Sequence, residues 1–130
     1  QDAVGFLAAG NWAPDMDNAA NKAFVDAFEA KYDYVPGGYA MQAYDTAMLI
    51  DSAVSKVGGD MSNKGAVREA LKAADFTSVR GDFAFSNNHY PVQDFHMLQV
   101  VERADGKFHT SYMETMIEDY SDSFKQDCAM

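Results

Sequence analysis

The spacing of apolar residues changes once along this chain, near residue 79, and that change constrains the fold more than any other feature. Between residues 20 and 74, apolar side chains recur every three or four positions, which is the spacing of helices that bury one face. After residue 79, apolar and β-branched residues alternate or gather in short runs, which is typical of strands. A helical first part followed by a stranded last part predicts an α/β fold.

Turn-forming residues divide these two parts into the expected elements. The expected helices follow residues that cap a helix or break the chain, and they span about 20–32, 39–57 and 63–74. The expected strands are short and mostly apolar, and they span 3–9, 79–85, 94–102 and 108–116. Asp105-Gly106 predicts a hairpin turn between the last two strands. The polar tail, 117–130, is expected to be a short helix or an irregular segment.

Charge and composition exclude several classes of protein. The net charge is -10, and lysine and arginine form no cluster. A nucleic-acid partner is not expected, because neutralising phosphates requires a basic surface. A membrane span is not expected either, since no run approaches the ~20 apolar residues that a spanning helix needs. The 48% hydrophobic content, with 13% aromatic residues, indicates a folded domain rather than a disordered one.

The two ends of the chain suggest a piece of a larger protein. The sequence begins at Gln1 rather than methionine and runs directly into an apolar segment, as a processed or truncated product would. Cys128 is the only cysteine, so two interpretations stay open. Its partner lies in a part of the protein outside this sequence, or Cys128 is a free thiol near the terminus.

No pattern of residues indicates catalysis, a metal ion or a cofactor. Asp15 and Asp17 form an Asp-x-Asp pair on a loop, but the twelve-residue calcium loop with its closing glutamate is missing. Helix capping is the expected role of these two residues and of Asp45. The histidines lack metal-ligand spacing and are expected at the surface or on edge strands: His89, His96 and His109. Since nucleophile-elbow and phosphate-loop motifs are also missing, we expect a protein that is not an enzyme.

Four stretches, in order along nearly the whole chain, carry a family resemblance. They are Val4 to Phe24 through the Trp12-Ala13-Pro14 loop, Lys31 to Asp45 through Pro36 and Tyr39, Val67 to Phe85 through Arg80-Gly81, and Pro91 to Val101 through Gln93-Asp94-Phe95. Together they resemble the C-terminal portion of type I periplasmic binding proteins of the leucine/isoleucine/valine-binding class. The resemblance implies a periplasmic-binding-protein-like I fold, in which two α/β lobes flank a cleft and the chain crosses between them three times.

The resemblance also implies how the chain is divided between the lobes. This sequence is expected to be a C-terminal fragment, in which residues 1–88 complete the N-terminal lobe and residues 89–130 cross to the edge of the C-terminal lobe. It is expected to hold a three-layer α/β/α lobe piece plus a C-terminal β-hairpin. Because unpaired strand edges recruit partners, the fragment is expected to self-associate.

The function implied by the resemblance is capture of a small solute. The parent protein is expected to be the periplasmic solute-binding component of an ABC importer and to deliver its solute to the membrane permease. The expected solutes are a branched-chain or other hydrophobic amino acid, or an aromatic carboxylate. The alternative is a ligand-sensing domain of the same fold, joined to a receptor or a transcription regulator.

Four residues are candidates for contact with the solute. The resemblance places an aromatic residue that faces the cleft at Tyr39, whose alternative role is to pack at the start of a helix. Met41 lies near enough to join that pocket or else fills the core. Asn11 and Trp12 follow the first strand, where loops of α/β folds line ligand crevices. Trp12 is expected either to stack on a ligand or to cover a lobe interface. The family's contacts to carboxylate and ammonium groups come mainly from segments outside this sequence.

Overall fold

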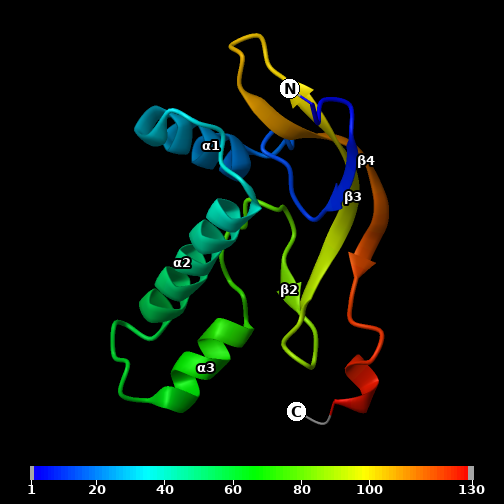
Figure 1. Ribbon diagram of the computed structural model, residues 1–130. Helices are drawn as coiled ribbons and strands as arrows, with labels where there is room; N and C mark the ends of the chain where they lie inside the picture. The colour runs from blue at the N-terminus through cyan, green and yellow to red at the C-terminus, as the bar shows by residue number, and fades with distance from the viewer. Residues whose placement is uncertain (1, 129–130) are drawn as a thin grey trace.

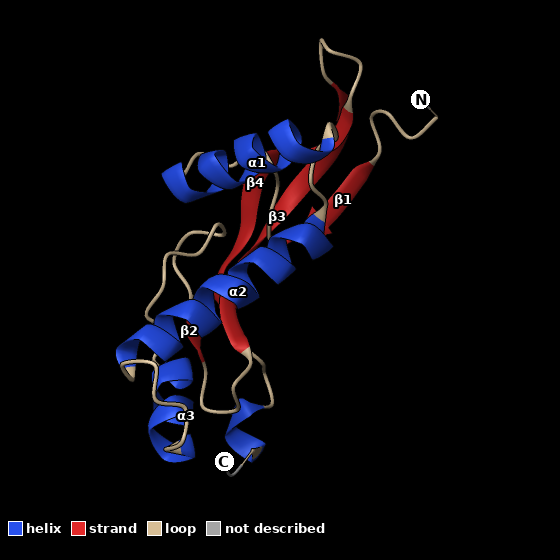
Figure 2. Ribbon diagram, turned by 90° about the vertical axis from the view of Figure 1, so that its left-hand side faces the viewer, coloured by secondary structure: helices blue, strands red, loops and turns tan. Residues whose placement is uncertain are grey.

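The computed structural model describes residues 2–128, which form three helices beside one antiparallel sheet (Figures 1 and 2). The helices are α1 (Ala19–Tyr32), α2 (Gly38–Lys56) and α3 (Lys64–Lys72), followed near the end by the 3-10 helix η1 (Lys125–Asp127). The strands are β1 (Leu7–Gly10), β2 (Ala84–Phe85), β3 (Pro91–Glu102) and β4 (Phe108–Tyr120). Both views show the helices on the same side of the sheet, so the described residues supply two layers of the expected arrangement.

Strand β3 is the centre of the sheet, because each of the other strands pairs with it in antiparallel orientation. Strand β4 follows β3 along most of its length, starting with Phe108 opposite Glu102. The predicted hairpin turn at Asp105-Gly106 is confirmed, and Gly106 takes a φ of +81° that suits glycine. Within residues 2–128, no helix is both long and apolar enough to cross a membrane.

Local capping explains where the helices begin and end. The Asn18 side chain accepts a hydrogen bond of 2.7 Å from the Asn21 N–H, which caps the start of α1. Asp33 ends α1 in the left-handed conformation, with a φ of +58°. Helix α2 starts after Gly37 and α3 after Asn63, whose side chain accepts from the Ala66 N–H. All three predicted helices are confirmed, with ends within two residues of those expected.

The core lies where α1, the start of α2 and the loop after β1 meet. Its buried side chains are Trp12, Phe24, Val25, Met41 and Val79. Phe24 is the central ring of this cluster. Its centroid lies 6.2 Å from that of Trp12 and 4.7 Å from that of Tyr44. Because these rings come from three separate segments, they fix the loop that follows β1 against both helices.

The predicted strand over 79–85 is wrong for most of its length. Only the two residues of β2 pair with β3, and the segment before them forms a turn with a bridge between Ser78 and Gly81. Asp45 of α2 causes this, since its carboxylate accepts hydrogen bonds from the Val79 N–H and the Ser78 hydroxyl. The bonds draw the backbone toward α2, and Gly81 supports the turn with a φ of +96°.

The other strands differ from prediction mainly at their ends. Strand β1 begins only at Leu7, because the preceding residues form a turn in which Gly5 has a φ of +89°. Strand β3 begins at Pro91 rather than at residue 94, and β4 continues to Tyr120 rather than ending at residue 116. The tail contains η1, in agreement with the expected short helix.

Candidate functional site

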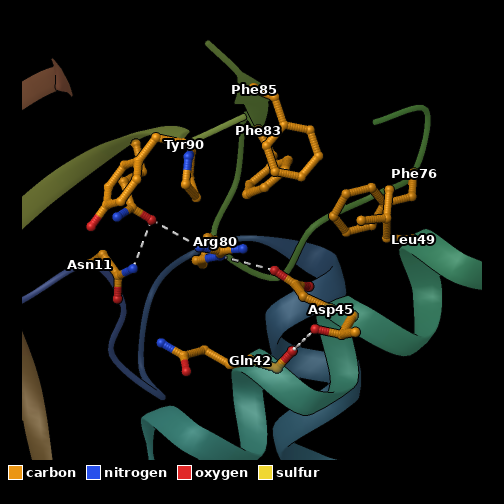
Figure 3. Close-up of a pocket in the computed structure, with 12 residues that line it drawn as sticks. Asn11, Gln42, Asp45, Leu49, Phe76, Arg80, Phe83, Phe85 and Tyr90 are labelled. Atoms are coloured by element: carbon orange, nitrogen blue, oxygen red, sulfur yellow. Dashed lines mark hydrogen bonds and ion pairs between the residues drawn. The ribbon is translucent and has the colours of Figure 1, made fainter. Parts of the chain in front are cut away.

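A cavity of about 420 Å³ lies where the middle of α2 meets the 76–83 segment, β2 and the start of β3 (Figure 3). Its apolar lining consists of Leu49, Phe76, Phe83, Phe85, Tyr90 and Pro91. Its polar lining consists of Asn11, Gln42, Asp45, Thr46, Arg80 and Gln93. A hollow with an apolar wall and a few convergent polar groups is the general form of a small-molecule site.

Arg80 is the centre of the polar groups in this cavity. Its Nε donates to Asp45 Oδ2 at 3.0 Å, and its Nη1 donates to Gln93 Oε1 at 2.8 Å. The same Gln93 oxygen accepts from Asn11 Nδ2 at 2.7 Å. Four side chains from separate parts of the chain are thus joined in one network, which Figure 3 shows crossing the cavity.

Asp45 balances the charge of Arg80 in a buried position. The Asp45 side chain is only 2% exposed and that of Arg80 only 11%. Asp45 also accepts from the Val79 N–H at 3.0 Å and the Ser78 hydroxyl at 2.6 Å. A carboxylate with three donors is stable when buried, because each donor replaces lost water. The expected capping role of Asp45 is therefore wrong, since it lies inside α2 and holds the 78–80 turn.

Aromatic rings form the opposite wall of the cavity. The Arg80 guanidinium carbon lies 4.6 Å from the centroid of the Phe83 ring, which is the geometry of a cation–π contact. Phe83 meets Phe76 and Phe85 edge-on, with centroid distances of 5.4 and 5.0 Å. Figure 3 shows these rings on one side of Arg80, with Asn11 and Gln42 on the other.

The structure separates the four sequence candidates. Asn11 lines the cavity, whereas Trp12 and Met41 are core residues that are 5% and 0% exposed. Trp12 Nε1 donates to Asn21 Oδ1 at 2.7 Å, so both its ring and its polar group are occupied within the protein. Tyr39 is 90% exposed in the first turn of α2, where its side chain projects away from the core.

Asn21 positions the loop that carries Asn11, and the sequence reasoning did not find this role. Asn21 is fully buried, and its Nδ2 group donates to the carbonyl oxygens of Ala13, Pro14 and Met16. The sequence does hold an indication of this role: Asn21 lies on the apolar face of a predicted helix, three residues after the capping asparagine.

A second cavity, of about 330 Å³, lies beside His96 at the middle of β3. His96 is 2% exposed, so the expectation of a surface or edge-strand histidine is wrong for this residue. Its Nδ1 lies 3.1 Å from Thr115 Oγ1, and burial lowers its pKa, although the nearby Asp94 charge opposes this shift. No group of three or more potential ligands suited to a metal ion occurs among residues 2–128.

Comparison with known proteins places the chain in a family. The model of the periplasmic binding protein family matches residues 1–107, which is more than half of the sequence. The chain belongs to the periplasmic binding protein family. Because this is a family of binding proteins, membership agrees with the expectation that the chain is not an enzyme. Comparison with curated proteins gave no match.

Solved structures of this family share the fold. An ABC-transporter solute-binding protein from Rhodopseudomonas palustris, in complex with benzoate, has a TM-score of 0.82 at 34% identity; the match covers 93% of this chain and 32% of that one. An ABC-transporter substrate-binding protein from Sphaerobacter thermophilus has a TM-score of 0.81 at 29% identity, covering 92% and 33%. A leucine-binding protein from Thermotoga maritima has a TM-score of 0.66 at 18% identity, covering 87% and 31%, which shows the fold alone. The expected type I periplasmic-binding-protein fold is confirmed, and the chain spans about a third of these structures.

Proposed function

We propose that this chain is the C-terminal third of a two-lobed protein that captures a small solute in the periplasm and delivers it to the permease of an ABC importer. The observation that carries the proposal is the similarity to the benzoate-bound solute-binding protein, at 34% identity over 93% of this chain. The solute is a branched-chain or other hydrophobic amino acid, or an aromatic carboxylate, since structures similar to this chain include binders of both kinds.

The contacts of β1 and α1 support a particular division of the chain between the two lobes. Strand β1 pairs with β3, and α1 is tied to the β3–β4 hairpin by ion pairs of Glu29 with Arg103 and of Asp33 with Lys107. We assign β1 and α1 to the lobe of residues 89–130, whereas the sequence alone favoured one lobe for residues 1–88. The chain then crosses to the other lobe after α1 and returns before β3.

On this proposed division, the Arg80 cavity lies between the two lobes. Asn11 and Gln93 lie on the β1–β3 side, whereas Asp45, Phe76 and Arg80 lie on the side of α2 and the segment that follows α3. A solute held there contacts both sides, and lobe closure is favoured because only the closed state makes all of those contacts. Tyr39 does not line this cavity, but its exposed ring at the start of α2 is available to a ligand without repacking of the core.

Trp12 and Met41 act on the site through the core rather than by touching the solute. Both fill the cluster that holds the loop bearing Asn11 against α2. A truncation at either position is therefore expected to lower stability as well as affinity, whereas a truncation of Tyr39 is expected to lower affinity alone.

Thermal-shift measurements on the full-length protein that carries this chain test the proposed function. A ligand at about 100 times its Kd stabilises the folded state by about 2.7 kcal/mol, which raises the melting temperature by several degrees. The panel contains benzoate, 4-hydroxybenzoate, leucine and valine, with glucose as the unrelated control. A rise with at least one carboxylate and none with glucose is expected. If no carboxylate raises the melting temperature, the proposed function is wrong.

The isolated chain is proposed to self-associate through its strand edges. Within residues 2–128, β1 and β4 each pair only with β3, and large apolar side chains nearby are exposed: Phe6, Leu7, Met113, Met116 and Ile117. Such edges and faces favour pairing with a second copy. Light scattering during size exclusion is expected to give a mass that rises with concentration, and a constant mass of 14.3 kDa would argue against the proposal.

A further inference from the structure

The Arg80 guanidinium holds hydrogen-bond donors that no described residue uses. Nε and Nη1 are bonded to Asp45 and Gln93, whereas Nη2 has no acceptor among residues 2–128. Nη2 is not one of the fully buried atoms that lack a partner, and Arg80 lines both this cavity and a neighbouring hollow, so this donor can be reached by a ligand. A fixed guanidinium with a free N–H group can donate a charge-assisted hydrogen bond to a carboxylate.

The guanidinium is also fixed in place before any ligand arrives. Asp45 holds one edge, Gln93 holds another, and the Phe83 ring lies 4.6 Å from the guanidinium carbon. Gln93 is itself held by Asn11 from the other side of the cavity. A receptor group with so little freedom left loses little entropy on binding, and affinity rises accordingly.

The wall beside Arg80 suits a flat ring. Phe83 stands edge-on to both Phe76 and Phe85, so the combined surface of the three rings is apolar and rigid. Half-exposed Tyr90 closes the other end of the cavity, with a hydroxyl available to a polar ring substituent. The cavity of about 420 Å³ lies within the size range of small-molecule sites and is ample for a single ring with one carboxylate.

The cavity offers poor recognition of an α-ammonium group. Asp45 is the single carboxylate among the described residues that line it, and it already accepts from Arg80, Val79 and Ser78. An amino acid placed here would find no free carboxylate in the cavity lining for its ammonium group, and burying an unpaired charge is costly. Further carboxylates line a separate hollow that shares Arg80 with this cavity: Asp82, Asp94, Glu118 and Asp119. The balance of groups therefore favours an acid that carries no amine.

From these observations, and resting on the proposed function, we propose that Arg80 binds the carboxylate of a monocyclic aromatic acid whose ring packs on Phe76, Phe83 and Phe85. Asp45 and Gln93 are positioning residues in this scheme, because they orient Arg80 without touching the solute. Asp45 also accepts from the Val79 N–H and the Ser78 hydroxyl, so its charge is shared among three donors rather than directed at Arg80 alone.

Isothermal titration calorimetry on the full-length protein that carries this chain tests the assignment, with benzoate, leucine and benzyl alcohol as probes. Wild type is expected to bind benzoate at least about tenfold more tightly than either other probe, because only benzoate joins a ring and a carboxylate without an amine. Arg80→Gln is expected to weaken benzoate about 10- to 100-fold and to leave benzyl alcohol unchanged. Arg68→Gln, which removes the same charge from the exposed surface of α3, is expected to bind benzoate like wild type.

A double variant separates ligand contact from folding. Arg80→Gln alone leaves Asp45 as an unpaired buried carboxylate, whereas Asp45→Asn with Arg80→Gln removes both charges together. If Arg80 touches the carboxylate, the folded double variant binds benzoate as weakly as Arg80→Gln. Recovery of wild-type affinity in the double variant would show that Arg80 acts only through the ion pair, and the assignment would be wrong.

The probes also separate this assignment from the proposed function. If wild type binds leucine but not benzoate, the aromatic-acid assignment is overturned while solute capture stands. If benzoate binds and Arg80→Gln leaves its affinity unchanged, the carboxylate lies elsewhere and the role of Arg80 is overturned alone. Binding of no carboxylate at all would overturn both.

Discussion

Removal of the Asn21 side chain is expected to destabilise the fold strongly, and the size of the effect follows from its hydrogen bonds. In Asn21→Ala, the Trp12 Nε1 group loses its acceptor and the Pro14 carbonyl loses its donor. The carbonyls of Ala13 and Met16 keep partners, since they also accept from the Met16 and Asn18 N–H groups. Two buried groups are thus left unsatisfied, and at about 1–3 kcal/mol each the loss is roughly 3 kcal/mol of unfolding free energy.

Urea denaturation, followed by the fluorescence of Trp12, measures this loss. Trp12 is the only tryptophan in the sequence, and it lies at the affected site. With a slope near 2 kcal/mol per molar urea, a loss of about 3 kcal/mol moves the midpoint down by roughly 1.5 M. Asn87→Ala is the matched control, because Asn87 is exposed and its hydrogen bond to the Lys125 carbonyl is exposed as well, so a change within about 0.5 kcal/mol is expected there. A loss below about 1 kcal/mol in Asn21→Ala would refute the reasoning.

Three further perturbations test separate parts of the structure. Burial lowers the pKa of His96, so the unfolded state takes up a proton before the folded state does as the pH falls below about 6.5. The free energy of unfolding should therefore drop by up to about 1.4 kcal/mol per pH unit in that range. In urea titrations at pH 7.5 and 5.5, His96→Gln should reduce this dependence on pH. Ser78→Ala removes one hydrogen bond to Asp45 and one from the Arg80 N–H, so the free energy of unfolding in chemical denaturation should fall by about 1–2 kcal/mol. An unchanged free energy would contradict the role of these bonds in the turn. In Gly81→Ala the new methyl group has open space around it, but the residue must keep a φ of +96°. The resulting backbone strain, about 1 kcal/mol or more, should lower the melting temperature. An unchanged melting temperature would show that the turn does not need this φ.

Local signals were sufficient for the helices and for the hairpin. Asn18 precedes an apolar pattern with helical spacing, and its side chain caps α1 as such a residue should. Asp105-Gly106 gives the hairpin turn because glycine takes the positive φ that the turn requires. In each case the deciding interaction joins residues that are close in sequence.

The segment before β2 and the candidate site depend instead on distant residues. Asp45 and Arg80 are 35 positions apart, and no local pattern indicates that they pair. The Asp-Phe-Ala-Phe alternation at residues 82–85 resembles a longer strand, but the bonds to Asp45 turn the preceding backbone toward α2. The one indication in the sequence that Asp45 is buried is its position, four residues after Met41 and thus on the same face of the helix.

Trp12 and Met41 show why the sequence alone does not separate a ligand-contacting role from a core role for apolar residues. A tryptophan in a loop after a strand, or a methionine at a helix start, fits either a ligand wall or a core. The packing of α1 decided the outcome, since Phe24 and Val25 come together with both residues in one buried cluster. That packing depends on the angle between α1 and α2, which the spacing of apolar residues does not specify.

The most direct test of the account is a crystal structure of the full-length protein grown with benzoate. Benzoate is expected between the two proposed lobes, with its carboxylate within hydrogen-bonding distance of Arg80 Nη2 and its ring against Phe83 and Phe85. Benzoate bound elsewhere, with the Arg80 cavity filled by protein side chains, would contradict this assignment.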